Sequence, residues 1–181
     1  MPQIRISILT EGNMRKLAIS VIGPVALLGL WGVATHGQGG QAGGASAQQA
    51  PTDKAVYFAN ADLQATWKDL EAKQVINKRV LEGGTHSINI RIVKEGDAPL
   101  VHAKSADVWV MTAGTATAIT GGQLLDPQKR PNVDDVAGSS IRGGIEQPLK
   151  PGDVLYVPPG VAHGFKDVKE FRAFLIRFDT K

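Results

Sequence analysis

The histidine with the most informative surroundings is His163, near the end of the 181-residue chain. It closes the stretch GDVLYVPPGVAH, in which Gly152 permits a tight turn into a short alternating strand. Pro158-Pro159-Gly160 then stops strand pairing, because proline donates no ladder hydrogen bond. Imidazole can carry protons or bind a metal near neutral pH. The stretch therefore predicts a sheet-lined cavity with a histidine at its mouth.

This stretch resembles the second motif of the cupin superfamily. That motif reads glycine, five residues, proline, one residue, glycine, two residues, histidine. Gly152, Pro158, Gly160 and His163 occupy its four fixed positions, and Asp167 replaces the asparagine that ends it. The match at all four positions makes the resemblance specific.

The first cupin motif is matched only in part. It reads glycine, five residues, histidine-x-histidine, three or four residues, glutamate, six residues, glycine. Gly96 and His102 fit its first part, and Asp107 and Gly114 fit its last part with aspartate for glutamate. Lys104 stands where the second histidine belongs, and the gap from Lys104 to Asp107 is one residue short.

The resemblance, which covers roughly residues 84–178, implies a metal site. In the family, the histidines and the glutamate of these motifs hold a divalent ion inside the barrel. Carried over residue by residue, the ligands are His102, Asp107 and His163. Two imidazoles and a carboxylate form the donor set of open zinc and non-haem iron sites. The resemblance thus implies a candidate site for iron, manganese, zinc or nickel, and the alternative is that both histidines only form hydrogen bonds.

Lys104 complicates this site, because a protonated lysine has no lone pair to give a metal. It would repel a cation beside it. It could instead pair with Asp107 in the place of the ion, anchor a substrate carboxylate, or act as a catalytic acid. Lys104 is therefore a candidate catalytic and substrate-pocket residue.

Trp109 and Met111 share the parity of Asp107 and should face the same side of their strand. They are expected to form the apolar wall of a small-molecule pocket, or simply the barrel core.

His86 begins a strand in which Ile88, Ile90 and Ile92 alternate with polar residues. It is either a replacement metal ligand or a partly buried histidine bonded to a neighbouring strand. Asn89 and Arg91 lie on the opposite face from Ile90, and we expect them to face solvent.

The elements that must position these residues are mostly short strands. Asn60-Ala61-Asp62 begins a helix, and the spacing of Leu63, Trp67 and Leu70 gives it one apolar face. Short strands between glycine turns predict a sandwich or barrel. The resemblance implies an all-β fold, a double-stranded β-helix or jelly-roll barrel with a short N-terminal helix packed on it. Expected elements are the helix 60–73, strands at 107–113, 115–120, 154–157 and 171–178, and a long excursion at 123–143 with a strand near 139–142.

The N-terminus reads as a targeting segment. Met14-Arg15-Lys16 precedes an apolar run from residue 17 to 34, and Ala45-Ser46-Ala47 matches a signal-peptidase site. We expect a periplasmic or secreted protein, attached to the membrane only if the run stays uncleaved. The predicted division is leader 1–47, lead-in with helix 48–83, and cupin barrel 84–181.

Composition excludes several classes of protein. The chain has no cysteine, so disulfides and thiolate chemistry are excluded. The net charge is only +3, much of it in the leader, so nucleic acid is not an expected partner. No serine elbow or phosphate loop is present.

Three functions remain open. The first is an exported cupin that binds a small molecule, through a degenerate divalent-metal site in the barrel. The second is a metal-dependent oxygenase, isomerase or lyase that uses His102, Asp107 and His163. The third is a metal-free structural or interaction scaffold. The resemblance also implies a homodimer, and the fold alone does not select among these functions.

Overall fold

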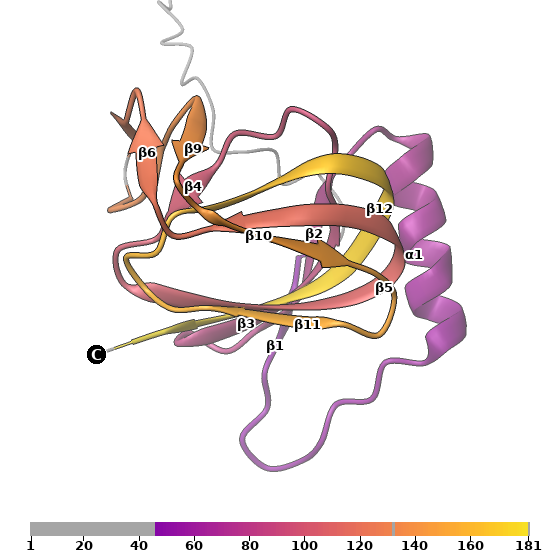
Figure 1. Ribbon diagram of the computed structural model, residues 1–181. Coiled ribbons are helices and arrows are strands. Elements are labelled where there is room, and N and C mark those ends of the chain that lie inside the picture. Colours follow the sequence, from indigo (N-terminus) through magenta and orange to yellow (C-terminus); the bar gives the residue numbers. More distant parts are fainter. Residues whose placement is uncertain (1–45, 132, 181) are drawn as a thin grey trace, which may run out of the picture. The chain divides into compact units, whose positions relative to one another are not determined.

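The computed structural model describes residues 46–131 and 133–180, which form one helix and a set of mostly antiparallel strands (Figure 1). The predicted leader lies almost wholly outside these residues. No helix in the described part of the chain is long and apolar enough to cross a membrane. The elements are β1 (Gln48–Gln49), α1 (Asn60–Ala72), β2 (Asn77–Glu82), β3 (His86–Ile92), β4 (Leu100–Val101), β5 (Ser105–Thr120), β6 (Gln123–Leu125), β7 (Gln128–Lys129), β8 (Val136–Ala137), β9 (Ser140–Arg142), β10 (Ile145–Leu149), β11 (Val154–Val157) and β12 (His163–Asp179).

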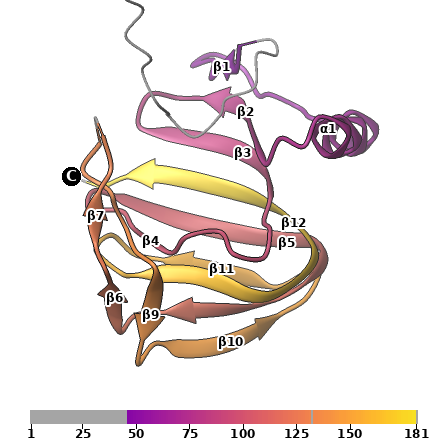
Figure 2. The ribbon, with the colours of Figure 1, turned by 90° about the horizontal axis from the view of Figure 1, so that it is seen from above.

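Two long strands organise the sheet. β5 and β12 run antiparallel to each other, from the pair His163 and Thr120 to the pair Asp179 and Ser105 (Figures 1 and 2). The first half of β5 also pairs with β11 and its second half pairs with β10, while the second half of β12 pairs with β3. Both long strands therefore contribute to two layers, as in a double-stranded β-helix. The expected all-β barrel is confirmed.

Gly114 lies in the middle of β5, where the sequence predicted a strand end. Its φ is +71°, and the facing segment of β12 also bends, with positive φ at Asp167 and Glu170. The register shifts between Lys166 and Arg172. A glycine in the left-handed region bends the strand without ending its ladder. The predicted strands 107–113 and 115–120 are consequently one strand, and the predicted break at Gly114 was wrong.

Gly114→Ala is expected to destabilise the fold more than Gly121→Ala. Both glycines have positive φ, +71° and +73°, which costs an alanine about 1–2 kcal/mol. At Gly114 a Cβ would also lie 2.2 Å from the Lys169 carbonyl oxygen, whereas nothing lies within 4 Å at Gly121. Urea denaturation of both variants checks this prediction, and equal losses of unfolding free energy would contradict it.

The predicted helix is confirmed, and it covers the isoleucine face of β3. Trp67 and Leu70 of α1 pack on Ile90, and the Trp67 ring meets the edge of Phe174 at a centroid distance of 5.1 Å. Because α1 covers this face, the other face of β3 points into the barrel. Asn89 is accordingly buried rather than solvent-facing, which corrects the expectation from the sequence. His86, at the start of β3, is exposed instead of partly buried.

A second cluster of apolar side chains fills the inside of the barrel. Trp109 packs edge-on against Phe165 at 4.9 Å, and Phe165 lies 5.0 Å from Phe171. Met111 belongs to this core and is 2% exposed. Trp109 belongs both to this core and to the lining of the cavity described below, so it lies between them.

Some strands were not expected from the sequence. β10 contains Pro148 and pairs only with β5, which suits a proline because an edge strand leaves its nitrogen unpaired. β2 pairs with β3, so the sheet begins before residue 84. The excursion 123–143 forms β6 to β9, and β9 confirms the strand expected near 139–142. β8 of this excursion pairs with β4, next to His102.

Candidate functional site

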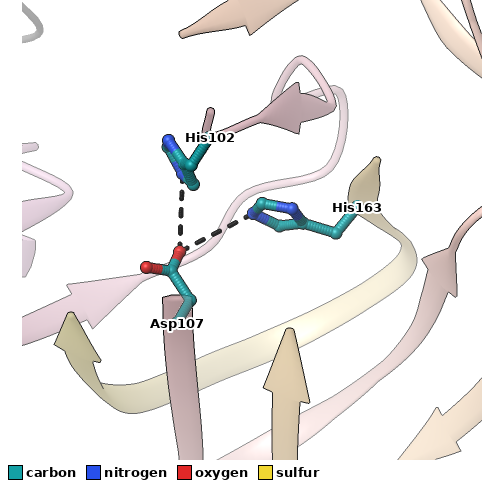
Figure 3. A group of neighbouring side chains, drawn as sticks. All are labelled: His102, Asp107 and His163. Carbon is teal, nitrogen blue, oxygen red and sulfur yellow. Dashed lines mark ion pairs between the residues drawn. The ribbon is translucent and has the colours of Figure 1, made fainter. Parts of the chain in front are cut away.

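The structure brings His102, Asp107 and His163 together inside the barrel (Figure 3). Each offers one ligand atom, and these atoms lie within 4.8 Å of one another. The three residues are 3%, 1% and 4% exposed, so all three are withdrawn from bulk water. They form a group of buried donors of the kind that could hold a metal ion.

The bend at Gly160 links the two histidines. The Gly160 amide donates a hydrogen bond to the His102 carbonyl at 2.8 Å, with Gly160 at a φ of +77°. His163 then starts β12 and pairs with Leu100 of β4. Its Nδ1 donates to the Val161 carbonyl at 3.1 Å, which leaves Nε2 facing Asp107 at 3.7 Å. The Gly-x-x-His end of the motif thus fixes both the position of His163 and its tautomer.

Arg177 is the residue of this site that the sequence analysis missed. It is the register partner of Asp107 across β5 and β12. Its Nε donates to Oδ1 of Asp107 at 2.7 Å and its Nη2 donates to Oδ2 at 2.8 Å. The same Nη2 lies 2.7 Å from His102 Nε2. A guanidinium has only donors, so the imidazole must accept there and carry its proton on Nδ1.

The outer side of His102 faces the excursion. Its Nδ1 lies 2.8 Å from Oδ2 of Asp135, within ion-pair distance, although the angle is not that of a hydrogen bond. A carboxylate beside the far nitrogen orients an imidazole. Asp135 therefore supports the tautomer that the Arg177 contact requires.

The charges of the site hold one another in their ionised forms. Burial raises the pKa of the Asp107 carboxyl, but the hydrogen bonds that Arg177 donates and the charge of its guanidinium outweigh burial and bring that pKa below its usual range. Burial lowers the pKa of the Arg177 guanidinium, and the Asp107 carboxylate more than compensates. Burial also lowers the pKa of His163, so its imidazole is neutral at pH 7. The centre is thus a carboxylate–guanidinium pair flanked by imidazoles.

These residues match a divalent metal in type but not in arrangement. A metal would need the lone pairs of His102 Nε2 and Asp107 Oδ2, and Nη2 of Arg177 lies within 2.8 Å of both atoms. A fixed positive charge at this position repels a second cation. The arrangement with Arg177 inward therefore does not fit a bound metal.

Lys104 is not part of this centre, contrary to expectation. Its side chain is 74% exposed and forms an ion pair with Asp134. The hydrogen bond that Lys104 donates to the Asp134 carboxylate raises the pKa of Lys104. β5 begins at Ser105, so Lys104 lies in the turn before the strand. The gap between Lys104 and Asp107 is one residue shorter than in the motif, and it leaves the Lys104 side chain outside the site. The cation that pairs with Asp107, where a divalent metal ion was expected, is the Arg177 guanidinium.

Lys104→Gln is expected to leave the free energy of unfolding close to that of wild type, because exposed ion pairs contribute little. Urea denaturation at low and at high salt measures this free energy. A loss of several kcal/mol would show that Lys104 supports the buried centre.

A cavity of about 380 Å³ lies next to the Asp107–Arg177 pair and the two imidazoles. Asp107, Arg177 and both histidines line it, and Trp109 forms part of its wall as expected. Met111 does not line it and belongs to the core. Further lining comes from residue 76, β2, β3, residues 97–98, β4, the excursion and β12, through Ile76, Asn77, Arg79, Asn89, Arg91, Asp97, Ala98, Leu100, Arg130, Ala137 and Leu175. The excursion therefore contributes to the lining of the cavity, through Arg130 and Ala137.

Comparison with known proteins reveals fold likeness only. No family model and no curated protein sequence matches the chain. Among solved structures it is similar to KdgF from Halomonas sp., at 13% identity, covering 58% of this chain and 80% of that one, with a TM-score of 0.41. It is similar to a double-stranded β-helix protein from Klebsiella pneumoniae, at 22% identity, 59% and 77% coverage and a TM-score of 0.42. It is also similar to a Cupin 2 barrel protein from Salinispora arenicola, at 17% identity, 57% and 74% coverage and a TM-score of 0.39.

The fold assignment rests on the topology of the chain itself. β5 and β12 wind together through two layers, and the glycine-proline bend places His163 opposite His102 and Asp107. These are the positions that the two sequence motifs predict. The chain therefore has the double-stranded β-helix fold of the cupin superfamily.

Proposed function

We propose that this chain is a small-molecule-binding barrel whose ligand occupies the cavity above the Asp107–Arg177 pair. The observation that carries the proposal is a cavity of about 380 Å³ on which buried His102, Asp107 and His163 converge. Ligand sites are commonly 300–1,000 Å³ in volume, with apolar walls and a few placed polar groups. A scaffold barrel would instead be expected to fill this space with apolar side chains.

Each polar group has a distinct task in this proposal. The Asp107 carboxylate holds the Arg177 guanidinium by two parallel hydrogen bonds, which fixes the plane of the fork. Nε2 of His163 is the imidazole nitrogen left available for a ligand proton or donor. Trp109 supplies an apolar surface beside them.

The second candidate is a metal-dependent enzyme of oxygenase, isomerase or lyase type, and the buried His102, Asp107 and His163 donors favour it. It requires Arg177 to leave these donors. The metal content of wild type, compared with that of Arg177 and His163 variants, separates this candidate from the first.

The N-terminal segment supports a further part of the proposal, which is export. Met14-Arg15-Lys16 and the apolar residues 17–34 have the order of charges and apolar residues of a secretory signal. We propose that the barrel works outside the cytoplasm, and fractionation of cells expressing the full chain tests this.

Ligand screening by thermal denaturation of the full chain tests the binding proposal. A ligand of the cavity raises the midpoint of wild type, because it binds only the folded state. His163→Gln is expected to reduce that shift, whereas His86→Gln, on an exposed histidine outside the cavity, is expected to keep it. Equal shifts in both variants, or none in wild type across a broad library, would refute the proposal.

A further inference from the structure

The cavity carries an unusual concentration of positive charge. Among the residues that line it, the basic ones are Arg79, Arg91, Arg130 and Arg177, and the acidic ones are Asp97 and Asp107. The arginines come from three separate parts of the chain, namely β2 and β3, the excursion, and β12. The fold therefore gathers guanidinium groups that the sequence keeps far apart.

These arginines differ in how fully their charges are paired. Arg177 is bound by Asp107 at both carboxylate oxygens. Arg91 reaches Asp97 only at 3.5 Å, longer than a direct hydrogen bond. Arg130 has no carboxylate within ion-pair distance in residues 46–131 and 133–180. Arg91 and Arg130 thus retain donors for another partner.

The positive charges act on one another inside the cavity. Burial lowers the pKa of the Arg91 guanidinium, and the charges of Arg177 and Arg130 lower it further against the opposing effect of Asp97. Like charges held together in a half-buried space destabilise the protein unless an anion joins them. The cavity is therefore electrostatically suited to a negatively charged guest.

The rest of the lining indicates an organic guest. Trp109, Leu100, Leu175 and Ile76 add an aromatic ring and three aliphatic side chains. Such walls contribute little to binding a bare inorganic ion, and they stabilise a carbon skeleton by removing it from water.

Resting on the proposed binding function, we infer that the ligand is a small organic anion whose oxyanion group lies between Arg91 and Arg130. Its carbon skeleton lies against Trp109 and Leu175. The planar guanidinium fork matches the oxygens of a carboxylate or of a phosphate, so these two groups share the recognition chemistry.

Isothermal titration calorimetry on the full chain tests this inference with matched probes. The carboxylates are benzoate and succinate, the neutral analogues are benzamide and succinamide, and phenyl phosphate and inorganic phosphate complete the set. Carboxylates are expected to bind at least tenfold more tightly than their amides. The affinity of phenyl phosphate compared with that of benzoate decides whether the cavity prefers a phosphate or a carboxylate. Inorganic phosphate is expected to bind more weakly than phenyl phosphate, because it has no apolar group to contact the cavity wall.

Arg130→Gln is the variant of choice, because Arg130 has no described ion-pair partner to leave behind and glutamine keeps a polar side chain. It is expected to weaken anion binding about tenfold to hundredfold, since hydrogen bonds to charged groups are worth about 1.5–3 kcal/mol. Arg142→Gln makes the same charge change on an exposed residue of the same excursion, outside the cavity, and is expected to leave binding unchanged.

The outcomes separate this inference from the function on which it rests. Amides that bind as tightly as carboxylates, or equal affinities in the Arg130 and Arg142 variants, would overturn the anion inference and leave the binding function standing. Absence of binding by every anionic and neutral probe would overturn both.

Discussion

Asp107→Ala is expected to lower the free energy of unfolding by about 3–5 kcal/mol, because it leaves the Arg177 guanidinium without its partner inside the barrel. Asp107 is 1% exposed and accepts two hydrogen bonds from Arg177 at 2.7 and 2.8 Å. The Arg177 side chain is 28% exposed and reaches some water, so we expect the lower end of this range. Urea denaturation of wild type and variant measures the loss.

Glu146→Ala is the matched control. Glu146 pairs with Lys166 across side chains that are 54% and 39% exposed. Exposed pairs of this kind contribute little to stability, so the free energy of unfolding of this variant should remain close to that of wild type. Comparable losses in the two variants would mean that the Asp107–Arg177 pair has no special structural role.

The pH dependence of the Asp107→Ala effect has a definite sign. The folded pKa of Asp107 is lower than that of an unfolded aspartate, which is about 3.9. The stability contributed by this carboxylate is therefore fully present above that value and declines as the pH falls through the folded pKa. The gap between wild type and variant should be constant from pH 5 to 8 and narrow in acid. A gap that widened below pH 4 would contradict the assignment.

The resemblance to the two cupin motifs implied that His102, Asp107 and His163 lie together, and the structure brings the three side chains together. The part of this arrangement that local information carries is the bend before His163. Gly152, Pro158 and Gly160 define a turn whose geometry follows from residue type, and His163 stands at a fixed distance from it. Arg177 depends instead on the register of two strands whose contacting residues are 70 positions apart. No local pattern gives that register, although one signal existed. Phe171, Ala173 and Leu175 alternate inward along β12, and Arg177 is the next residue on the same face.

The error at Asn89 and Arg91 has a different cause. Alternation identifies two faces of a strand, but it does not say which face points into the barrel. In β3 the apolar face is buried under α1, at Trp67, and the polar face lines the cavity. Both faces of β3 are covered by other parts of the protein, so the polarity of a side chain does not show whether it is exposed to solvent. An expected solvent face proved to hold part of the proposed binding site.

Arg177→Ala is expected to convert the centre into a divalent-metal site. Removing the guanidinium frees Nε2 of His102 and both oxygens of Asp107, and it leaves a buried carboxylate without a cation. A zinc ion would replace the lost charge and find three donors of the preferred kind. Because an unpaired buried charge costs about 3–5 kcal/mol, zinc affinity should rise by about 10²–10⁴-fold over wild type.

Two measurements on full chain prepared without chelators or a histidine tag check this prediction. Elemental mass spectrometry after incubation with zinc should find near-stoichiometric metal in Arg177→Ala and little in wild type. Zinc should also raise the thermal midpoint of the variant, because a ligand of the folded state stabilises it. This second readout remains informative if the variant is destabilised without metal.

Two control variants show whether the added zinc binds to the buried donors or elsewhere on the protein. Arg172→Ala removes an arginine of the same strand that pairs with Glu71 on the surface, and it should gain no zinc. Arg177→Ala with His163→Ala should lose most of the gain, because His163 is the third donor. Stoichiometric zinc in wild type, abolished by His163→Ala alone, would show that Arg177 leaves the donors when metal arrives. The metal-dependent enzyme would then become the better proposal, and the arginine would be a displaceable occupant of its site.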